Sequence, residues 1–222
     1  MQQIFIIDDH PIVRSGITLI LENTPGIEII GEAGTIPQAR EFLSHQKPDL
    51  ILLDLFLEEQ SGLEFLKELR ANDPKVKVLI LSMMEPSTYA KRVLKAGAKG
   101  FVAKAQASEE LVAAIDLVLS GHVYLSSQVA LQLATQTIHP ESDYSPHSEL
   151  ACLTDRQLQI FELVGQGLTQ TQIADSLGIE RRTGESHKAQ IRDRLNCQTM
   201  AELNAKAAHG SGTDRTAPAV SR

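Results

Sequence analysis

Two hydrophobic patterns succeed each other along the chain. Up to about residue 120, short apolar runs alternate with amphipathic stretches in which apolar residues return every three or four positions. Over residues 153–209 only the amphipathic, helical spacing is found. The segment between them, TIHPESDYSPHSEL, is polar, contains two prolines and has no period, which is typical of a linker. The pattern therefore predicts two domains joined by a polar connector.

The first region is expected to form a parallel sheet. Its apolar runs predict strands at 3–7, 27–33, 49–54, 77–82 and 100–104. Helical patterns lie at 11–23, 37–45, 62–71, 87–96 and 108–120, and SSQVALQLATQ predicts one more helix. Five such strand-and-helix repeats predict an α/β fold, a flavodoxin-like doubly wound five-stranded parallel sheet with helices on both faces.

The second region is expected to form a small all-α domain. Its helices are predicted at 155–166, 169–177, 181–195 and 200–208, with Thr154 as the N-cap of the first. The segment GLTQTQIADSLGIERRT combines a short helix, a turn containing glycine and a second helix, which is the pattern of a helix-turn-helix. An ordinary helical bundle would show the same spacing, so the pattern alone leaves DNA binding open.

Composition narrows the class of protein further. No apolar run approaches the roughly 20 residues that cross a bilayer, and Asp8 and Asp9 interrupt the N-terminal apolar run before a signal-peptide core could form. Cys152 and Cys197 belong to no cluster of cysteines or histidines, which argues against a disulfide framework and a zinc site. We therefore expect a cytoplasmic protein without a membrane partner.

The acidic charge is unevenly placed. The chain of 222 residues carries a net charge of −7, which taken alone argues against nucleic acid because phosphates attract Lys and Arg. Residues 1–130 hold 17 acidic and 12 basic side chains, whereas residues 149–209 hold 8 and 7. Within 180–196 five basic side chains face three acidic ones. Composition thus predicts DNA binding that is weak, salt-sensitive and dependent on dimerisation.

Candidate chemistry lies where the predicted strands end. Ligands of doubly wound sheets bind outside the carboxyl ends of the strands. Asp8 and Asp9 follow the first strand, and Asp54 ends the third. Three carboxylates at one edge repel each other unless a cation lies among them, and their hard oxygen ligands favour Mg²⁺. Ser82 and Lys104, at the ends of the fourth and fifth strands, can hold the oxygens of a phosphoryl group.

Each of these residues also has an ordinary explanation. The Asp pair could cap the helix that begins at Pro11, and Asp54 could open a turn. Ser82 and Lys104 could be plain surface residues. Four strand ends that all carry a group needed by a metal and phosphate site favour the site over these separate explanations.

The motifs IFIIDDHPIVRSGI, LILLDLFLEEQSGLEFLKELR, VLILS and AGAKGFVAK, in this order over residues 3–125, resemble the receiver domains of two-component response regulators, particularly of the NarL/FixJ class. The resemblance implies that Asp54 accepts the phosphoryl group. Asp8 and Asp9 would bind Mg²⁺ directly or through water, and the backbone carbonyl of Phe56 would complete its coordination. The resemblance assigns Ser82 and Lys104 to the phosphoryl oxygens.

Three further positions in this region carry expectations. Phe101 matches the aromatic switch position of the family, although a plain core aromatic would also fit. Glu58 stands where the family commonly has proline. Phe56 and Met84 are apolar at positions that flank the approach of a hydrolytic water, which suggests slow loss of the phosphoryl group.

The segment LTDRQLQIFELVGQGLTQTQIADSLGI, with AELNAKA after it, resembles the LuxR-type helix-turn-helix that follows receivers of this class. The resemblance implies a recognition helix at 181–195 in the major groove, with Arg194 near its contacts. The candidates for phosphate and base contact are Arg181, Arg182, Thr183, Ser186, His187, Lys188 and Arg192. Gly184 departs from the apolar β-branched residue usual in the family, and Glu185 lowers the positive charge. Valine at position 184 is therefore expected to tighten DNA binding.

The sequence as a whole predicts a DNA-binding response regulator. A histidine kinase would phosphorylate Asp54, and a homodimer would read promoter DNA. The expected divisions are a receiver at 1–125, a helical and polar linker at 126–150, a helix-turn-helix domain at 151–209 and a disordered tail at 210–222. The chain is expected to catalyse only its own Mg²⁺-dependent phosphorylation and dephosphorylation. Two alternatives remain: a receiver protein that has lost DNA binding and acts through protein contacts, and a Mg²⁺-dependent phosphatase.

Overall fold

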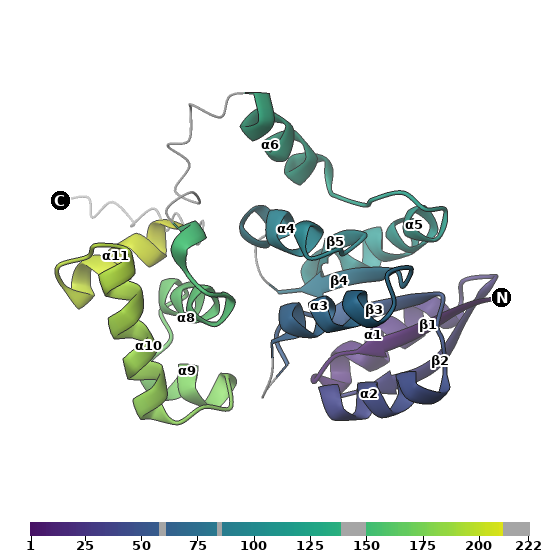
Figure 1. Ribbon diagram of the computed structural model, residues 1–222, viewed down its shortest axis with the longest axis horizontal. Helices are drawn as coiled ribbons and strands as arrows, with labels where there is room; N and C mark the ends of the chain where they lie inside the picture. The colour runs from purple at the N-terminus through teal and green to yellow at the C-terminus, as the bar shows by residue number, and fades with distance from the viewer. Residues whose placement is uncertain (58–60, 84–85, 139–149, 211–222) are drawn as a thin grey trace, which may run out of the picture. The chain divides into compact units, whose positions relative to one another are not determined.

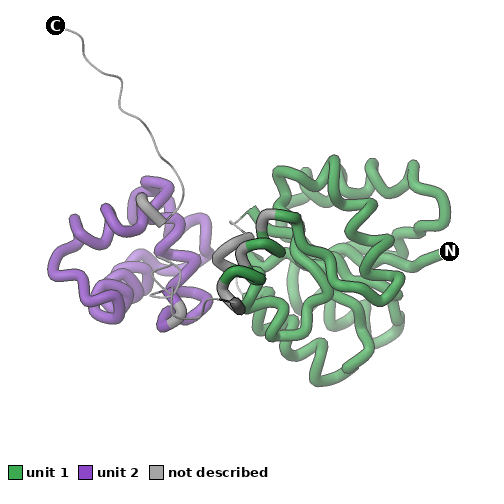
Figure 2. The backbone as a smooth tube through the Cα atoms, turned by 90° about the horizontal axis from the view of Figure 1, so that it is seen from above, with its two compact units in different colours: residues 1–142 green, residues 143–222 purple. Residues whose placement is uncertain are grey.

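The computed structural model describes residues 1–57, 61–83, 86–138 and 150–210 (Figure 1). The chain divides into two compact units, Met1–Ser142 and Asp143–Arg222, which Figure 2 shows in green and purple. The α/β pattern falls in the first unit and the purely helical pattern in the second. Within the described ranges, no helix is both long and apolar enough to cross a membrane.

The first unit is built on a five-stranded parallel sheet in the order β2-β1-β3-β4-β5. The strands are β1 (Gln2–Ile7), β2 (Ile27–Ala33), β3 (Leu50–Asp54), β4 (Val78–Ser82) and β5 (Gly100–Ala103). All residues of β3 and β4 are buried, as expected of continuous apolar runs covered on both faces. The predicted fold class is confirmed.

Helices cover both faces of this sheet, as the ribbon in Figure 1 shows. They are α1 (Pro11–Glu22), α2 (Ile36–His45), α3 (Gly62–Asn72), α4 (Pro86–Lys95) and α5 (Ala107–Leu119), followed by α6 (Ser127–Ile138) where the additional helix was predicted. On one face, α1 and α5 share a core with β1 and β3 through residues such as Ile17, Ile115 and Leu52. On the other, the Phe42 ring of α2 stacks on Phe5 of β1, with centroids 4.2 Å apart.

Local sequence explains where two of these helices begin. Thr35 precedes α2 and Ser61 precedes α3, and their side-chain oxygens accept hydrogen bonds from Gln38 N and Glu64 N. Each bond satisfies a backbone amide that the helix itself leaves without a partner. The start of α3 matters for function, because α3 follows directly on the loop after β3.

The second unit is a compact set of helices. They are α8 (Asp155–Gly165), α9 (Gln170–Ser176), α10 (Arg181–Arg194) and α11 (Met200–Gly210), preceded by the short 3₁₀ helix η3 (Leu150–Cys152). Thr154 caps α8 as predicted, and both α8 and α9 start with reciprocal capping boxes, Thr154 with Gln157 and Thr169 with Gln172. All four helices predicted from the hydrophobic spacing are therefore found in this unit.

Arg194 anchors the end of α10 to the start of α8. Its Nη1 donates to the Cys152 carbonyl at 3.0 Å and to Gln157 Oε1 at 2.7 Å. The Arg194 guanidinium is therefore engaged within the unit, and the expectation that Arg194 lies near the DNA contacts stays a prediction. The periodicity of a helix does not reveal such a bond, since the partners are about forty residues away in sequence.

Candidate functional site

The carboxyl ends of β1 and β3 bring acidic side chains together. Asp8 and Asp54 are buried, and Asp9 is half-buried. Ligand atoms of Asp8, Asp9, His10 and Asp54 all lie within 4.8 Å of one another. The three carboxylates predicted from the strand ends thus converge in one acidic cluster, which could bind a metal ion.

Lys104 joins this cluster from the next turn of chain after β5, where it opens the short 3₁₀ helix η1 (Lys104–Gln106). Its Nζ lies 2.6 Å from Asp54 Oδ2 and 2.7 Å from Asp8 Oδ2. Its side chain is only 6% exposed. Burial lowers the pKa of Lys104, but Asp54 and Asp8 raise it by more, so the net shift is upward and the ammonium stays charged.

The Asp54 carboxyl has a raised pKa. Burial raises the pKa of its carboxyl from 3.8 to about 7; Lys104 opposes this rise, and the negative charge of Asp8 adds to it. Asp54 Oδ1 also accepts a hydrogen bond from Phe56 N at 3.3 Å. The carboxyl therefore needs further positive charge beside it to remain ionised in neutral solution.

In a metal-free buffer, this shift is expected to make the first unit less stable as the pH rises. The unfolded carboxyl ionises near 3.8 and the folded one at about 7, so the folded state holds the proton more tightly between these values. The stabilisation is complete below the lower pKa and is lost through the upper one, by an amount on the order of 4 kcal/mol. Urea unfolding in EDTA across this range measures the effect.

The matched variant for this measurement is Asp54→Asn, which cannot titrate. The difference in stability between wild type and variant should change across the window, and adding Mg²⁺ should stabilise the wild type more at the upper pH than at the lower. A difference that stays constant with pH would contradict the raised pKa.

The donor set fits a divalent cation. Asp8 Oδ2 and Asp9 Oδ1 are buried, and among the described residues neither accepts a hydrogen bond of good geometry. Asp8 Oδ2 instead lies 2.7 Å from the Lys104 ammonium, and Asp9 Oδ1 lies 2.5 Å from the Nδ1 of His10. Carboxylate oxygens are the ligands that Mg²⁺ prefers.

The ordinary explanation of the Asp pair as a helix cap is wrong. The N-cap of α1 is His10, which makes no side-chain capping bond. Asp8 Oδ1 instead accepts a hydrogen bond from His10 N at 2.9 Å, and its backbone carbonyl accepts one from Arg14 at 2.6 Å. Sequence reasoning missed His10 as a member of the cluster, although its place directly after the Asp pair was a usable signal.

Gly62 packs closely against the backbone of Asp54 and Leu55. Its amide donates to the Leu55 carbonyl at 2.9 Å, and the loop folds back so that Phe56 and Ser61 form an antiparallel bridge. A Cβ at position 62 would lie 2.2 Å from the Asp54 carbonyl oxygen, closer than any real contact. Sequence reasoning did not single out this glycine; its signal was a glycine directly after the helix-capping Ser61.

Three further predicted residues, Ser82, Phe101 and Phe56, lie on β4, on β5 and on the loop after β3. Ser82 is buried at the end of β4, where its register partner is Ala103 of β5. Phe101 is 2% exposed within β5. Phe56 is half-buried, and its ring meets the buried Tyr89 ring edge-on with centroids 5.4 Å apart. Glu58 and Met84 lie outside the described residues.

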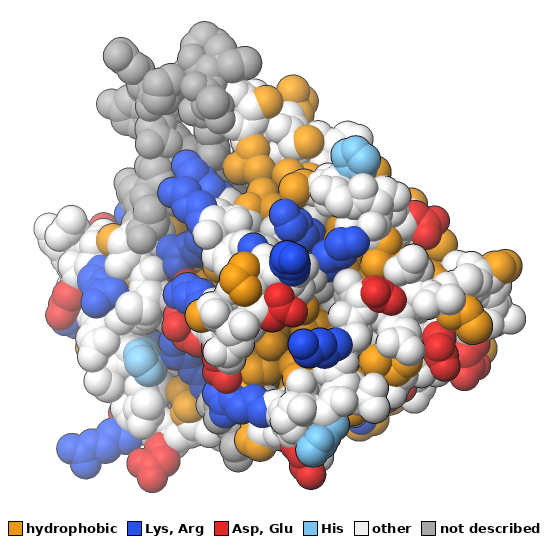
Figure 3. All heavy atoms as spheres, turned by 45° about the vertical axis from the view of Figure 1, so that its right-hand side comes forward, with side chains coloured by type: hydrophobic (Ala, Val, Ile, Leu, Met, Phe, Trp, Pro, Cys, Tyr) orange, Lys and Arg blue, Asp and Glu red, His pale blue; other side chains and the backbone are white. Residues whose placement is uncertain are grey.

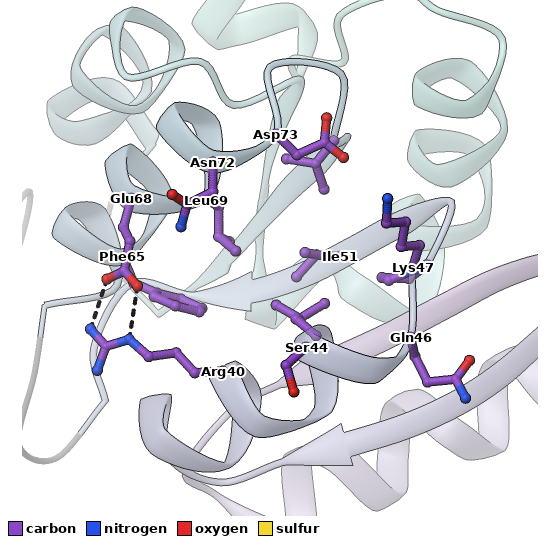
Figure 4. A pocket seen from close by; sticks show the side chains of 13 residues that line it. Arg40, Ser44, Gln46, Lys47, Ile51, Phe65, Glu68, Leu69, Asn72 and Asp73 are labelled. Atoms are coloured by element: carbon purple, nitrogen blue, oxygen red, sulfur yellow. Dashed lines mark hydrogen bonds and ion pairs between the residues drawn. The ribbon is translucent and has the colours of Figure 1, made fainter.

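A separate hollow of about 620 Å³ lies between α2 and α3 (Figure 4). Its floor includes Ile51, Phe65 and Leu69, and a two-bond ion pair between Arg40 and Glu68, at 2.8 and 2.7 Å, crosses its side. No member of the acidic cluster lines it. The hollow is therefore distinct from the strand-end site.

The predicted DNA-contacting residues lie on α10. Arg181, Arg182, Thr183 and Ser186 are exposed, whereas His187, Lys188 and Arg192 are half-buried. Arg181 lies 3.4 Å from Glu185, and Arg192 lies 2.8 Å from Asp193, so part of the positive charge is already paired. On the face shown in Figure 3, basic, acidic and hydrophobic side chains are interspersed.

Two members of this set have lowered pKa values. Burial lowers the pKa of His187, and the charge of Arg156 lowers it further. Burial also lowers the pKa of Lys188, with Glu185 opposing the shift. His187 is therefore neutral near pH 7, and the exposed arginines at the start of α10 carry more of the attraction for phosphate.

Comparison with known proteins agrees with both parts of this description. Residues 4–116 match the family model described as response regulator receiver domain, and residues 151–207 match bacterial regulatory proteins, luxR family. Response regulator UvrY of Escherichia coli (strain K12) is 32% identical over 203 residues, covering 91% of this chain and 92% of UvrY. Response regulator GacA of Pseudomonas viridiflava is 32% identical over 204 residues, covering 91% and 94%.

Solved structures give the same picture of the fold. A LuxR-family two-component response regulator from Aurantimonas sp. SI85-9A1 has a TM-score of 0.58 at 33% identity, covering 61% of this chain and 97% of that one. RcsB from Salmonella enterica serovar Typhimurium, bound to promoter rprA in the presence of phosphomimetic BeF3-, has a TM-score of 0.62 at 20% identity, covering 93% and 98%. At that identity the second likeness concerns the fold alone.

Proposed function

Since the chain belongs to the two-component response regulators of the NarL/FixJ class, with a receiver domain and a LuxR-type helix-turn-helix domain, we propose that Asp54 receives a phosphoryl group from a phosphohistidine of a histidine kinase. The observation that carries the proposal is the buried contact of Lys104 with both Asp54 and Asp8. A cation fixed beside a buried carboxylate suits a group that must accept still more negative charge.

The proposed transfer needs little from the protein beyond position and charge. An oxygen of the ionised Asp54 attacks phosphorus, the new P–O bond forms as the P–N bond to imidazole breaks, and the imidazole nitrogen leaves. Lys104 and Ser82 hold the phosphoryl oxygens. Asp8, Asp9, Asp54 and the carbonyl of Phe56 would hold Mg²⁺, which supplies neutralisation of charge on the transferred group.

Phosphorylation would then change the output of the protein. The phosphoryl group adds a charge of about −1.5 to −2 at a site that is already acidic. Lys104 and Ser82 would turn toward it, and Phe101 would shift within the space beside Ser82 as the aromatic switch. We propose that this change favours a homodimer in which two copies of α10 read the two halves of a promoter site.

Proteins of this family are transcription regulators and, in general, not enzymes. The reactions proposed for this chain are therefore confined to its own Asp54: transfer of the phosphoryl group onto it and slow hydrolysis from it. We retain the predicted divisions at 125, 150 and 209 as part of the proposal, and the matched ranges 4–116 and 151–207 support them.

Promoter binding is tested by gel shift with the region upstream of the chain's own gene, with and without phosphorylation. We expect the phosphorylated protein to bind at lower concentration. Arg182→Ala, which removes an exposed cation from α10, should weaken binding to all sequences by about threefold to tenfold and lower the salt slope by about 1.

The control for this variant is Lys75→Ala, which removes an exposed cation from the receiver. It should bind as the wild type does. A wild type that fails to shift the DNA in either state, while still accepting a phosphoryl group, would instead favour a receiver that acts through protein contacts.

A further inference from the structure

The N-terminus of α10 lacks the side-chain capping bonds that α8 and α9 have. The N-termini of α8 and α9 are closed by capping boxes, whereas the N-cap of α10, Glu180, makes no side-chain capping bond. No acidic side chain lies in the first turn of α10. Gly184, one turn into the helix, lowers its intrinsic stability further. The first turn of α10, which carries Arg181 and Arg182, therefore depends on contacts from outside the helix for its stability.

The structure shows a side chain that reaches this turn from α9. Gln170 is the first residue of α9, and its Nε2 donates to the Arg181 carbonyl at 3.1 Å. The two helices pack against each other, as Figure 1 also shows. A carbonyl oxygen has two lone pairs, so this bond can be made in addition to the helical one.

The path of the Gln170 side chain depends on the glycine. Gly184 is buried, and a Cβ there would lie 2.4 Å from Gln170 Nε2 and 3.7 Å from Ile179 Cδ1. The amide of Gln170 thus fills the space beside Gly184 where another residue would have its Cβ. The sequence analysis treated Gly184 as the loss of a packing or groove contact; in the structure, Gln170 of α9 lies in the space beside it.

We infer that Gln170 and Gly184 act as a matched pair, in which Gln170 is a positioning residue that fixes the DNA-reading end of α10. This inference rests on the proposed DNA binding. Valine at position 184 would displace the Gln170 amide from the Arg181 carbonyl, so the expectation that valine tightens DNA binding is reversed. The exposed side chains at the start of α10 would lose their fixed orientation, although the fold would persist.

The pair is tested on the full-length chain with Gln170→Ala, Gly184→Ala and the double variant. Hydrogen exchange of the backbone amides at positions 184 and 185 measures the contact without DNA, because these are the first amides of α10 that donate within the helix, as Gly184 N does to the Glu180 carbonyl. Gln170→Ala should speed exchange by about threefold to tenfold, as expected for the loss of one hydrogen bond. Gly184→Ala should slow exchange in the Gln170→Ala background, where alanine only improves helix propensity, but not in the wild-type background. An equal effect of Gly184→Ala in both backgrounds would overturn the pairing.

Binding of the phosphorylated chain to labelled DNA from its own upstream region measures the consequence. Each single variant should bind more weakly by about threefold to tenfold, and Gln166→Ala, an exposed glutamine after α8, should bind as the wild type does. Unchanged affinity in Gln170→Ala, with binding by the wild type intact, would overturn the positioning role and leave the proposed function standing. Absence of binding by the wild type would refute the proposed function, while the exchange experiment would still decide the pairing.

Discussion

Asp54→Asn is expected to abolish phosphorylation of the chain. Incubation with Mg²⁺ and a small phosphodonor such as acetyl phosphate, followed by mass spectrometry of the intact protein, should give one added phosphoryl group on the wild type and none on the variant. The amide is close in size to the carboxyl, so the buried site can still fold, but it has no ionised oxygen to attack phosphorus.

The matched control is Asp116→Asn, which removes an exposed carboxylate from α5. It should be phosphorylated as the wild type is. Incorporation by Asp54→Asn at the wild-type level would mean that another residue accepts the phosphoryl group, and the acidic cluster would then have only a structural or metal-binding part.

Gly62→Ala is expected to cause the largest loss of stability among the substitutions considered. The added Cβ would meet the Asp54 carbonyl at 2.2 Å and the Leu55 Cα at 2.8 Å, and both are backbone atoms that cannot turn aside. The loop after β3 must shift, and we expect a loss of about 3 kcal/mol in the free energy of unfolding, measured with urea. The carbonyl of Phe56 would shift with the loop, so Mg²⁺ should also stabilise this variant less.

Gly16→Ala is the matched control. Gly16 is an exposed glycine within α1, and a Cβ there would meet nothing within 4 Å. Alanine should therefore raise the free energy of unfolding by about 0.5–1 kcal/mol through helix propensity. Equal and small effects at the two positions would show that the loop after β3 yields easily and does not hold the Asp54 backbone.

The sequence was sufficient for the elements and for most of the strand-end site. Continuous apolar runs mark β3 and β4 because both faces are covered, and parallel strands place their carboxyl ends at one edge. The convergence of Asp8, Asp9 and Asp54 followed from these two facts, and Lys104 needed only the end of β5.

Other features could not be read from residue types and spacing. The link between Gln170 and Gly184 depends on how closely α9 approaches α10, which the helical period does not give. The internal bonds of Arg194 depend on a partner near the start of α8. His10 joins the acidic cluster because the chain turns sharply after β1, where periodicity ends. For Gln170 and Arg194 the deciding quantity is a distance between segments that the sequence pattern does not relate, whereas the place of His10 directly after the Asp pair was a usable signal.

The two contacts of Lys104 link the binding of a metal ion to phosphorylation of the receiver. The Lys104 ammonium is a counter-ion for Asp8 and Asp54 at once. A divalent cation would take over the neutralisation of Asp8 and release Lys104 for a new partner. The equilibrium for the metal and the equilibrium for the phosphoryl group are then thermodynamically linked, and each must favour the other by the same factor. Under the proposed function, bound Mg²⁺ would therefore favour the phosphorylated form of the receiver, and phosphorylation would tighten the binding of Mg²⁺.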